Sequence, residues 1–394
     1  MTGPLNGITV LDFTRVLAGP YASMVMGDLG AEIIKVEQPR VGDIARGNGP
    51  FIGNVSSYFL SLNRGKKSIT LDISKPQGTE LALKMAQKCD ILLENFVPGT
   101  MKRFGLPYEI VSARNPQLIY ASISGFGQTG PYSQRPALDV IIQAMGGIMS
   151  ITGEEGGPPI RPGASLGDIT AGLFTCVAVL SALQEREKSG RGQYIDISML
   201  DCQAALLENA FARYFATGEV PKALGTRHPV FTPFQAYQAS NGFIAIALVG
   251  TQWPLFCSAI ERLDLIDDPR FIDGWQRTLH YDEINPIISD AIKAKTTQEW
   301  LILLGGLEIP CAPVNRIDQV ASDPHVNERN MFVEVPCPGA GKAKIVNSPL
   351  KFSRTRAKVV RGSPELGEHT VYVLKTLLKL SDGEIESLIQ QKVI

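Results

Sequence analysis

Short apolar runs alternate with stretches of helical spacing over the first 200 residues of the chain. We predict strands at 8–13, 32–37, 67–73, 90–94, 118–124 and 193–198, with helices between most of them. This alternation predicts right-handed βαβ units and a mostly parallel sheet that is covered on both faces. Ligands of such sheets bind beyond the carboxyl ends of the strands. The loops that leave those ends are 14–18, 38–54, 95–103 and 125–136.

The pattern changes near residue 225. Two strand-like runs, 233–239 and 243–249, flank the turn sequence Ser240-Asn241-Gly242, which predicts an antiparallel hairpin. We therefore predict an α/β protein with a Rossmann-like large domain, built on a mostly parallel sheet, and a smaller α+β domain. The expected boundaries are 1–200 for the large domain, 201–224 for a helical linker, 225–330 for the small domain, and 331–394 for a C-terminal return to the large domain.

Composition adds few constraints. The chain has 394 residues, 44% of them hydrophobic, and a formal net charge of −1. These values are ordinary for a soluble globular protein and indicate neither a nucleic-acid partner nor a membrane surface. The six cysteines are scattered, the four histidines are far apart in sequence, and neither set forms a metal-binding pattern. No signal peptide is visible, and the longest apolar run, 169–183, is too short to span a bilayer. We expect a cytoplasmic protein without a metal.

Asp168 lies where a loop rich in glycine and proline, 153–163, leads into that apolar run. Its position alone leaves two interpretations open. An aspartate here can cap a helix by accepting hydrogen bonds from the first free N–H groups. It can also be a nucleophilic carboxylate that is held by the positive end of the helix.

Three other stretches carry candidate ligand contacts. The run 63–67, Asn-Arg-Gly-Lys-Lys, is either a solvated edge or a contact for the phosphates of a nucleotide-like ligand. The stretch 125–131 matches a dinucleotide-binding loop weakly and is more typical of a glycine-rich loop over a ligand. Phe96 is either a core residue or a platform for an adenine, with Arg103 on a pyrophosphate.

Several motifs occur together, in order and at consistent spacing. They are the stretches 11–20 (LDFTRVLAGP), 28–37 (DLGAEIIKVE), 94–96 (ENF), 125–131 (GFGQTGP), 167–168 (GD) and 366–370 (LGEHT). With these motifs the chain resembles the class III CoA-transferases, of the formyl-CoA and carnitine type, from end to end. The resemblance implies an interlocked, ring-like dimer, most simply of two identical chains, with a heteromeric partner as the alternative.

The resemblance also implies that Asp168 is the nucleophile. It attacks an acyl-CoA thioester to give a mixed anhydride and CoA thiolate; CoA then returns to form an enzyme-bound thioester, which the acceptor carboxylate resolves. Acyl-CoA and a carboxylic acid are thus substrates, and no cofactor is permanently bound. The helix predicted to start at Asp168 and the glycines near 125–130 offer N–H groups to the oxyanion. We expect that no base is needed, because the carboxylate is already ionised at neutral pH.

The CoA site is implied by the same resemblance. Its matched positions are Val16, Leu17 and Ala18 around the reactive end, Leu71, Asp72, Ile73 and Ser74 near the adenosine, and Asn95, Phe96 and Arg103 in the pocket and at the phosphates. From the sequence we also expect Ser74 to cap the helix that contains Pro76. Two departures stand out: Gln38 replaces a frequent arginine, with Arg40 close by, and Pro136 and Leu138 replace a cation–aromatic pair, although Asp139 retains the acid at a substrate-facing position.

The substrate is the least constrained part of the prediction. Racemases of the same fold pair the aspartate with a histidine at the position of Leu138, and no histidine precedes His228, so we favour a transferase over a 2-methylacyl-CoA racemase. A silent subunit of a heteromeric transferase is a further alternative. The region 225–239 resembles members that move CoA from succinyl-CoA to dicarboxylic acids, and the lack of a glycine run in 217–242 disfavours oxalate or formate chemistry. Arg46 is either a surface arginine or the partner of a distal substrate carboxylate.

Overall fold

The structure is a computed structural model, and it describes residues 3–394. The described chain forms two compact units. The larger one contains the residues up to Ile148 together with Arg161–Phe215 and Pro324–Ile394, and the smaller one contains Met149–Ile160 and Ala216–Asp323. Segments that are distant in sequence therefore meet inside the larger unit.

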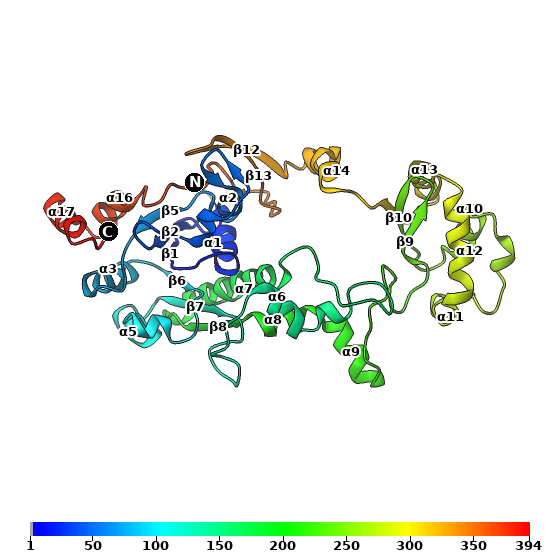
Figure 1. Ribbon diagram of the computed structural model, residues 1–394, viewed down its shortest axis with the longest axis horizontal. Coiled ribbons are helices and arrows are strands. Elements are labelled where there is room, and N and C mark those ends of the chain that lie inside the picture. The colour runs from blue at the N-terminus through cyan, green and yellow to red at the C-terminus, as the bar shows by residue number, and fades with distance from the viewer. Residues whose placement is uncertain (1–2) are drawn as a thin grey trace. The chain divides into compact units, whose positions relative to one another are not determined.

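A six-stranded sheet is the centre of the larger unit, and its strands follow one another across the sheet in the order β5-β2-β1-β6-β7-β8 (Figure 1). The strands are β1 Thr9–Asp12, β2 Glu32–Glu37, β5 Lys67–Thr70, β6 Ile91–Glu94, β7 Ile119–Ser124 and β8 Tyr194–Ser198. All five pairings are parallel, which confirms the predicted α/β class. If the six strands are numbered one to six along the chain, their order in the sheet is 3-2-1-4-5-6. The strands after β1 are added on one side of it and those from β6 onward on the other, so a crevice is expected between β1 and β6.

Helices cover both faces of this sheet. On one face α1 (Ala18–Asp28) and α7 (Leu166–Ser189) bury Met26 and Val179 against β1, β6 and β7. On the other face α3 (Pro76–Ala86), α5 (Tyr108–Arg114) and α16 (Thr370–Leu377) form the second apolar layer. Because alternate side chains of each strand point to opposite faces, the two layers take alternate strand residues, such as Val10 and Leu11 of β1.

The remaining elements of the chain before residue 216 and after residue 323 are short. They are η1 Ile44–Gly47, β3 Phe51–Ile52, β4 Val55–Ser56, α2 Ser57–Asn63, α4 Thr100–Arg103, α6 Asp139–Met145, η2 Ile148–Ser150, α8 Met199–Leu206, α9 Glu208–Thr217, α15 Pro324–Glu328, β12 Phe332–Cys337, β13 Gly341–Val346 and α17 Asp382–Gln390. A capping box of Ser381 and Glu384 opens α17.

The helix that carries Asp168 begins earlier than predicted. Ser165 is its N-cap residue, and Asp168 lies in its first turn, so the cap interpretation of Asp168 is wrong. The helix is also longer than the predicted apolar run. It is the one helix in the described part of the chain that is long and apolar enough to cross a membrane by length and composition. Its residues Cys176, Val179 and Ala182 are packed in the core beside the sheet, whereas its residues Leu173 and Val177 are exposed.

The smaller unit contains the predicted hairpin. Strands β9 (Phe234–Ala239) and β10 (Gly242–Ala247) pair antiparallel, with Ala239 opposite Gly242, and β11 (Cys311–Pro313) joins the free edge of β10. The helical elements that accompany this sheet are α10 Trp253–Ala259, η3 Leu263–Leu265, α11 Gly274–Leu279, α12 Tyr281–Lys293, α13 Thr297–Gly306 and α14 Ile317–Ser322. Trp300 and Phe256 are fully buried at the centre of this unit's own core.

Candidate active site

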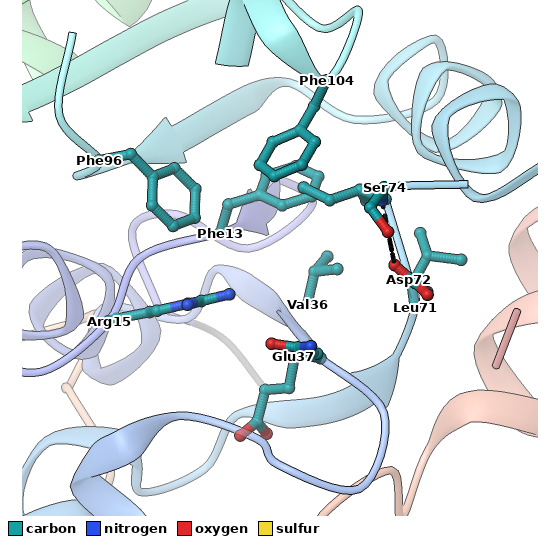
Figure 2. A pocket seen from close by; sticks show the side chains of 11 residues that line it. Phe13, Arg15, Val36, Glu37, Leu71, Asp72, Ser74, Phe96 and Phe104 are labelled. Carbon is teal, nitrogen blue, oxygen red and sulfur yellow. Dashed lines mark hydrogen bonds between the residues drawn. The ribbon is translucent and has the colours of Figure 1, made fainter. Parts of the chain in front are cut away.

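A pocket with three aromatic side chains opens at the carboxyl ends of β1, β2, β5 and β6 in the larger unit. We call it the aromatic pocket. Figure 2 shows Phe96 and Phe104 along one side of it, Asp72 and Ser74 along another, and Arg15 extending from beside Phe96 toward its middle. Its lining consists of Phe13, Arg15, Val36, Glu37, Gln38, Leu71, Asp72, Ile73, Ser74, Phe96 and Phe104. The aromatic pocket includes residues that follow β1 and β6, the two strands between which the strand order predicts a crevice.

A second pocket contains Asp168, and we call it the Asp168 pocket. Its lining comes from the ends of β1, β6 and β7, from the loop before α6, and from the start of α7: Arg15, Val16, Leu17, Ala18, Ile44, Asn95, Phe96, Val97, Pro98, Ile123, Ser124, Gly125, Ser133, Arg135, Ala137, Leu138, Asp139, Asp168 and Met199. Arg15 and Phe96 line both pockets. The two pockets are therefore neighbours.

The predicted CoA contacts divide between these pockets. Leu71, Asp72, Ile73 and Ser74 line the aromatic pocket, and Val16, Leu17 and Ala18 line the Asp168 pocket. Ser74 does not cap α3, whose N-cap residue is Lys75. Its hydroxyl instead donates to Asp72 at 2.5 Å. Gln38, the departure from the frequent arginine, lines the aromatic pocket.

Two cations that we expected in the CoA site, Arg103 at the phosphates and Arg40 near Gln38, lie outside both linings. Arg103 is exposed, and its guanidinium donates to the Thr100 hydroxyl at 3.1 Å. Arg40 is exposed and has a positive φ of 67°. Asn95 does line the Asp168 pocket, but its side-chain amide accepts from the backbone N–H of Arg15 at 2.8 Å and donates to the carbonyl of the same residue at 2.9 Å.

The environment of Asp168 disfavours its charged form. Its carboxyl is half-buried, and burial, then the nearby Asp139 carboxylate, raises its pKa to about 7, against an opposing effect of Arg161. A carboxyl with this pKa is ionised in only about half of the molecules at pH 7. The burial of Asp168 therefore counts against our expectation that its carboxylate is already ionised at neutral pH. A poorly solvated carboxylate is also a stronger nucleophile than one in water.

Asp139 holds the start of α7. One of its carboxylate oxygens accepts from the backbone N–H of Gly167 at 3.0 Å. The other accepts from Gln143 Nε2 at 2.7 Å and from Arg161 Nη2 at 2.8 Å. Both oxygens are thus engaged by the protein. The geometry favours a role in placing Asp168 and tuning its pKa rather than the direct substrate contact that we expected from the sequence.

The guanidinium of Arg46 is already hydrogen-bonded within the protein and is not free to bind a distal substrate carboxylate. Its Nη2 and Nε donate to the buried Glu37 at 2.7 and 2.8 Å, and its Nη1 donates to the carbonyl of Pro364 at 3.0 Å. The guanidinium also lies 3.9 Å from the centre of the Phe59 ring. Arg46 is absent from the lining of the Asp168 pocket, so the geometry does not support the distal-carboxylate role.

Two of the three cations in the basic run at 63–67, Arg64 and Lys66, lie neither at a solvated edge nor in a pocket lining. Arg64 is buried and forms an ion pair with Asp28 at 2.5 Å. Lys66 is buried as well, and its Nζ lies 3.2 Å from Asp12 and donates to the Ser23 hydroxyl at 2.7 Å. Both sequence interpretations are therefore wrong for these two residues, whose charges form ion pairs inside the larger unit.

Sequence reasoning missed three residues at the site. The guanidinium of Arg15 lies 5.1 Å from the centre of the Phe96 ring and has no carboxylate within ion-pair distance among residues 3–394. Arg135 stacks at 3.9 Å on Tyr132 and lines the Asp168 pocket. Ser124 is 7% exposed, and in the described chain its hydroxyl has no hydrogen-bond partner. The signal for Arg15 and Ser124 was available, since both follow or end strands at the carboxyl edge.

Comparison with known proteins identifies the class. The model of CoA-transferase family III matches residues 5–370, and this chain belongs to that family. It is 37% identical over 393 residues to the succinyl-CoA:glutarate CoA-transferase of Homo sapiens, covering 99% of this chain and 90% of the relative. It is 37% identical over 383 residues to the succinyl-CoA:mesaconate CoA-transferase of Haloarcula hispanica, covering 94% and 96%.

The fold comparison agrees. A CAIB/BAIF family protein from Brucella suis superposes with a TM-score of 0.85 at 35% identity, covering 96% of this chain and all of the other. The chain is also 38% identical over 369 residues, 93% of this chain and 94% of the relative, to the acetyl-CoA:oxalate CoA-transferase of Acetobacter aceti. The protein is thus a class III CoA-transferase. Overall similarity alone does not distinguish among these acids.

Proposed function

We propose that the protein moves CoA from succinyl-CoA to a second dicarboxylic acid, with Asp168 as the nucleophile. The observation that carries the proposal is the half-buried, poorly solvated Asp168 carboxyl at the end of a pocket that adjoins the aromatic pocket. A carboxylate nucleophile needs a dry, aligned site of this kind, because water weakens its attack on a thioester.

The proposed reaction proceeds through Asp168 in four steps. Its carboxylate adds to the thioester carbonyl of succinyl-CoA, the C–S bond breaks, and a succinyl-aspartyl anhydride and CoA thiolate form. The thiolate attacks the aspartyl carbonyl and releases succinate, which leaves an enzyme–CoA thioester. The acceptor carboxylate displaces the thiolate to form a new anhydride. The thiolate then attacks the acceptor acyl group, which releases the new CoA ester and restores Asp168.

The two pockets suggest how the donor lies. We place the adenine of CoA in the aromatic pocket, against Phe96 and Phe104, because aromatic rings provide a stacking surface. Arg15, without an acidic partner among the described residues, lies between the two pockets, where it can pair with the phosphates. The acyl end then reaches Asp168 past Val16 and Ala18.

The acceptor is proposed to be dicarboxylic for two reasons. The relatives named above are transferases to glutarate, mesaconate and oxalate, which are all dicarboxylic acids. In addition, Arg135 lines the Asp168 pocket and has no carboxylate within ion-pair distance in the described chain, so a distal carboxylate can pair with it. In this proposal Arg135 takes the distal-carboxylate role, which was one of the two interpretations of Arg46 in the sequence.

A panel of donors and acids tests this function. We expect the purified protein to convert succinyl-CoA and a dicarboxylic acid to succinate and the new CoA ester, detected by mass spectrometry. Arg135→Ala should raise the KM for dicarboxylic acids and leave the KM for monocarboxylic acids unchanged. The matched control is Arg316→Ala, at an exposed arginine of the smaller unit, which should change neither KM. Equal use of mono- and dicarboxylic acids by the native protein would refute the proposed substrate class.

We also propose that the protein acts as a homodimer. The described α7 exposes a row of apolar side chains, and α9 adds aromatic ones: Leu173, Phe174, Val177, Leu180, Phe211, Tyr214 and Phe215. Exposed apolar surface of this extent is typical of protein interfaces. Light scattering on the purified protein should give twice the mass of one chain, and a monomeric mass at micromolar concentration would refute the dimer.

A further inference from the structure

Val16 has an unfavourable backbone conformation at the wall of the Asp168 pocket. Its φ is 65°, in the left-handed region. A β-branched residue rarely adopts this conformation, because its Cβ crowds the following carbonyl, and glycine is the usual residue there. Such a conformation persists only where surrounding contacts enforce it. Val16 and Asp168 line the same pocket, so the conformation of this residue shapes the space in front of the nucleophile.

Three side chains hold the backbone of the loop 14–16, one residue each. Lys35 Nζ donates to the carbonyl of Thr14 at 2.7 Å. The Asn95 amide bonds both backbone groups of Arg15. Asp43 accepts from the backbone N–H of Val16, with 3.2 Å to each carboxylate oxygen. We call these three side chains the loop clamp.

The part of the clamp that contacts Val16 is buried and charged. Lys35 is completely buried and Asp43 is 1% exposed, and Lys35 Nζ lies 2.9 Å from Asp43 Oδ2. The Asp43 carboxylate also accepts from the backbone N–H of Ala45 at 3.0 Å. Burial alone would raise the pKa of Asp43, but Lys35 and the backbone donors lower it overall, so the carboxylate stays ionised as an acceptor. A buried ion pair with these bonds is rigid, since moving either partner leaves a charge unpaired.

We propose that Asp43, fixed by Lys35, is a positioning residue that holds Val16 in the left-handed conformation and so keeps the wall of the Asp168 pocket in its reactive shape. The inference rests on the proposed role of Asp168 as nucleophile. Asp43 itself is outside the lining of both pockets, and it acts through the backbone of Val16. The loop leads directly into α1, which begins at Ala18.

Asp43→Asn and a glycine rescue test the clamp. Asparagine keeps the size of the side chain but leaves Lys35 unpaired and weakens the bond to Val16. We expect kcat to fall by about 10–100-fold with a KM for succinyl-CoA within about 3-fold, because misplacement of a site wall affects the reacting geometry first. Val16→Gly added to Asp43→Asn should recover most of the lost kcat, because glycine adopts a positive φ without a clamp.

The matched control is Asp28→Asn, which removes another buried carboxylate from an ion pair, the one with Arg64, without contacting the loop. It should lose stability and keep kcat. Unchanged kcat in Asp43→Asn, no recovery in the double variant, or an equal kcat loss in Asp28→Asn would each overturn the inference.

Hydrogen exchange of the native protein covers the case in which Asp43→Asn does not fold. The Val16 amide should exchange slowly, because it donates to a buried carboxylate. Exchange at the rate of an unbonded amide would overturn the clamp. This measurement is independent of Asp168: full turnover of Asp168→Asn would refute the proposed function and leave the exchange result intact.

Discussion

Two groups of buried carboxyls in the larger unit have opposite electrostatics. In the interior beneath the loop 14–16, burial alone would raise the pKa of Asp12 and Asp43, yet both are lowered because Lys66 and Lys35 lie against them. In the Asp168 pocket, burial and then the Asp139 carboxylate raise the pKa of Asp168 to about 7, and the opposing effect of Arg161 does not offset them. The same desolvation thus gives structural anions in one region and a reactive, proton-sensitive carboxyl in the other.

The largest effect is expected when the reactive carboxyl is removed. Asp168→Asn should lower kcat by at least about 10³-fold, because the amide cannot form the anhydride. At the same time it should stabilise the protein at pH 8 by about 1–3 kcal/mol, since it removes a carboxyl whose charge is poorly solvated. Turnover assays and urea unfolding at pH 8 measure the two effects, and a variant that is both slow and less stable would show that Asp168 is structural.

The next largest effect, on the free energy of unfolding, is expected when a cation is removed from the interior group. Lys66→Met should destabilise the protein by about 3–5 kcal/mol at pH 7, because it leaves the fully buried Asp12 without its lysine. Lys67→Met, whose ion pair with Glu32 is partly exposed, is the matched control and should change the free energy of unfolding by at most about 1 kcal/mol. Equal effects of the two substitutions would mean that burial does not distinguish these pairs.

The pH dependence of kcat/KM tests the protonation of Asp168 in the native protein, without a substitution at this residue. The carboxyl must be ionised to attack, so kcat/KM should rise with pH and level off above an apparent pKa of about 7. Arg161 lowers the pKa of Asp168, so Arg161→Met should shift the profile to higher pH. The free energy of unfolding should depend on pH as well. Because folding raises the pKa of Asp168, the contribution of this residue to stability is present at low pH and is lost as pH rises through about 7. A flat profile between pH 5 and 9 would contradict this account.

The smallest effect on folding is expected at Ser124. Its buried hydroxyl has no partner among residues 3–394, so Ser124→Ala should change the free energy of unfolding by less than about 0.5 kcal/mol. If the hydroxyl binds substrate, kcat/KM should nevertheless fall by about 5–10-fold. Paired unfolding and kinetic measurements decide this, and loss of stability without loss of activity would assign Ser124 to the fold alone.

Local patterns predicted the regular elements well. The apolar run at 32–37 is β2, and the turn Ser240-Asn241-Gly242 joins β9 to β10 as expected. The helix of Asp168 was placed too late, because the residues before it, 164–167, are small or weakly patterned and Ser165 provides no side-chain cap to mark the start. One-dimensional periodicity is informative where an element buries one face, and it is weak at element ends.

Long-range charge pairing could not be read from the sequence. Arg64 pairs with Asp28, 36 positions away, and Lys66 pairs with Asp12, 54 positions away, so two cations of a run with a solvated appearance are buried. Likewise the Arg46 guanidinium is held by Glu37 and by the carbonyl of Pro364, which is 318 positions away. These contacts depend on the order of strands in the sheet and on the return of the C-terminal segment, which no local pattern specifies.

We propose that Asp168 forms the covalent intermediate of the transfer. The most direct test incubates the protein with succinyl-CoA, quenches it with hydroxylamine, and maps the modified side chain by peptide mass spectrometry. We predict a hydroxamate at Asp168 that depends on succinyl-CoA and is absent when the acyl-CoA is omitted. A hydroxamate at another carboxyl, or none while turnover proceeds, would contradict the account.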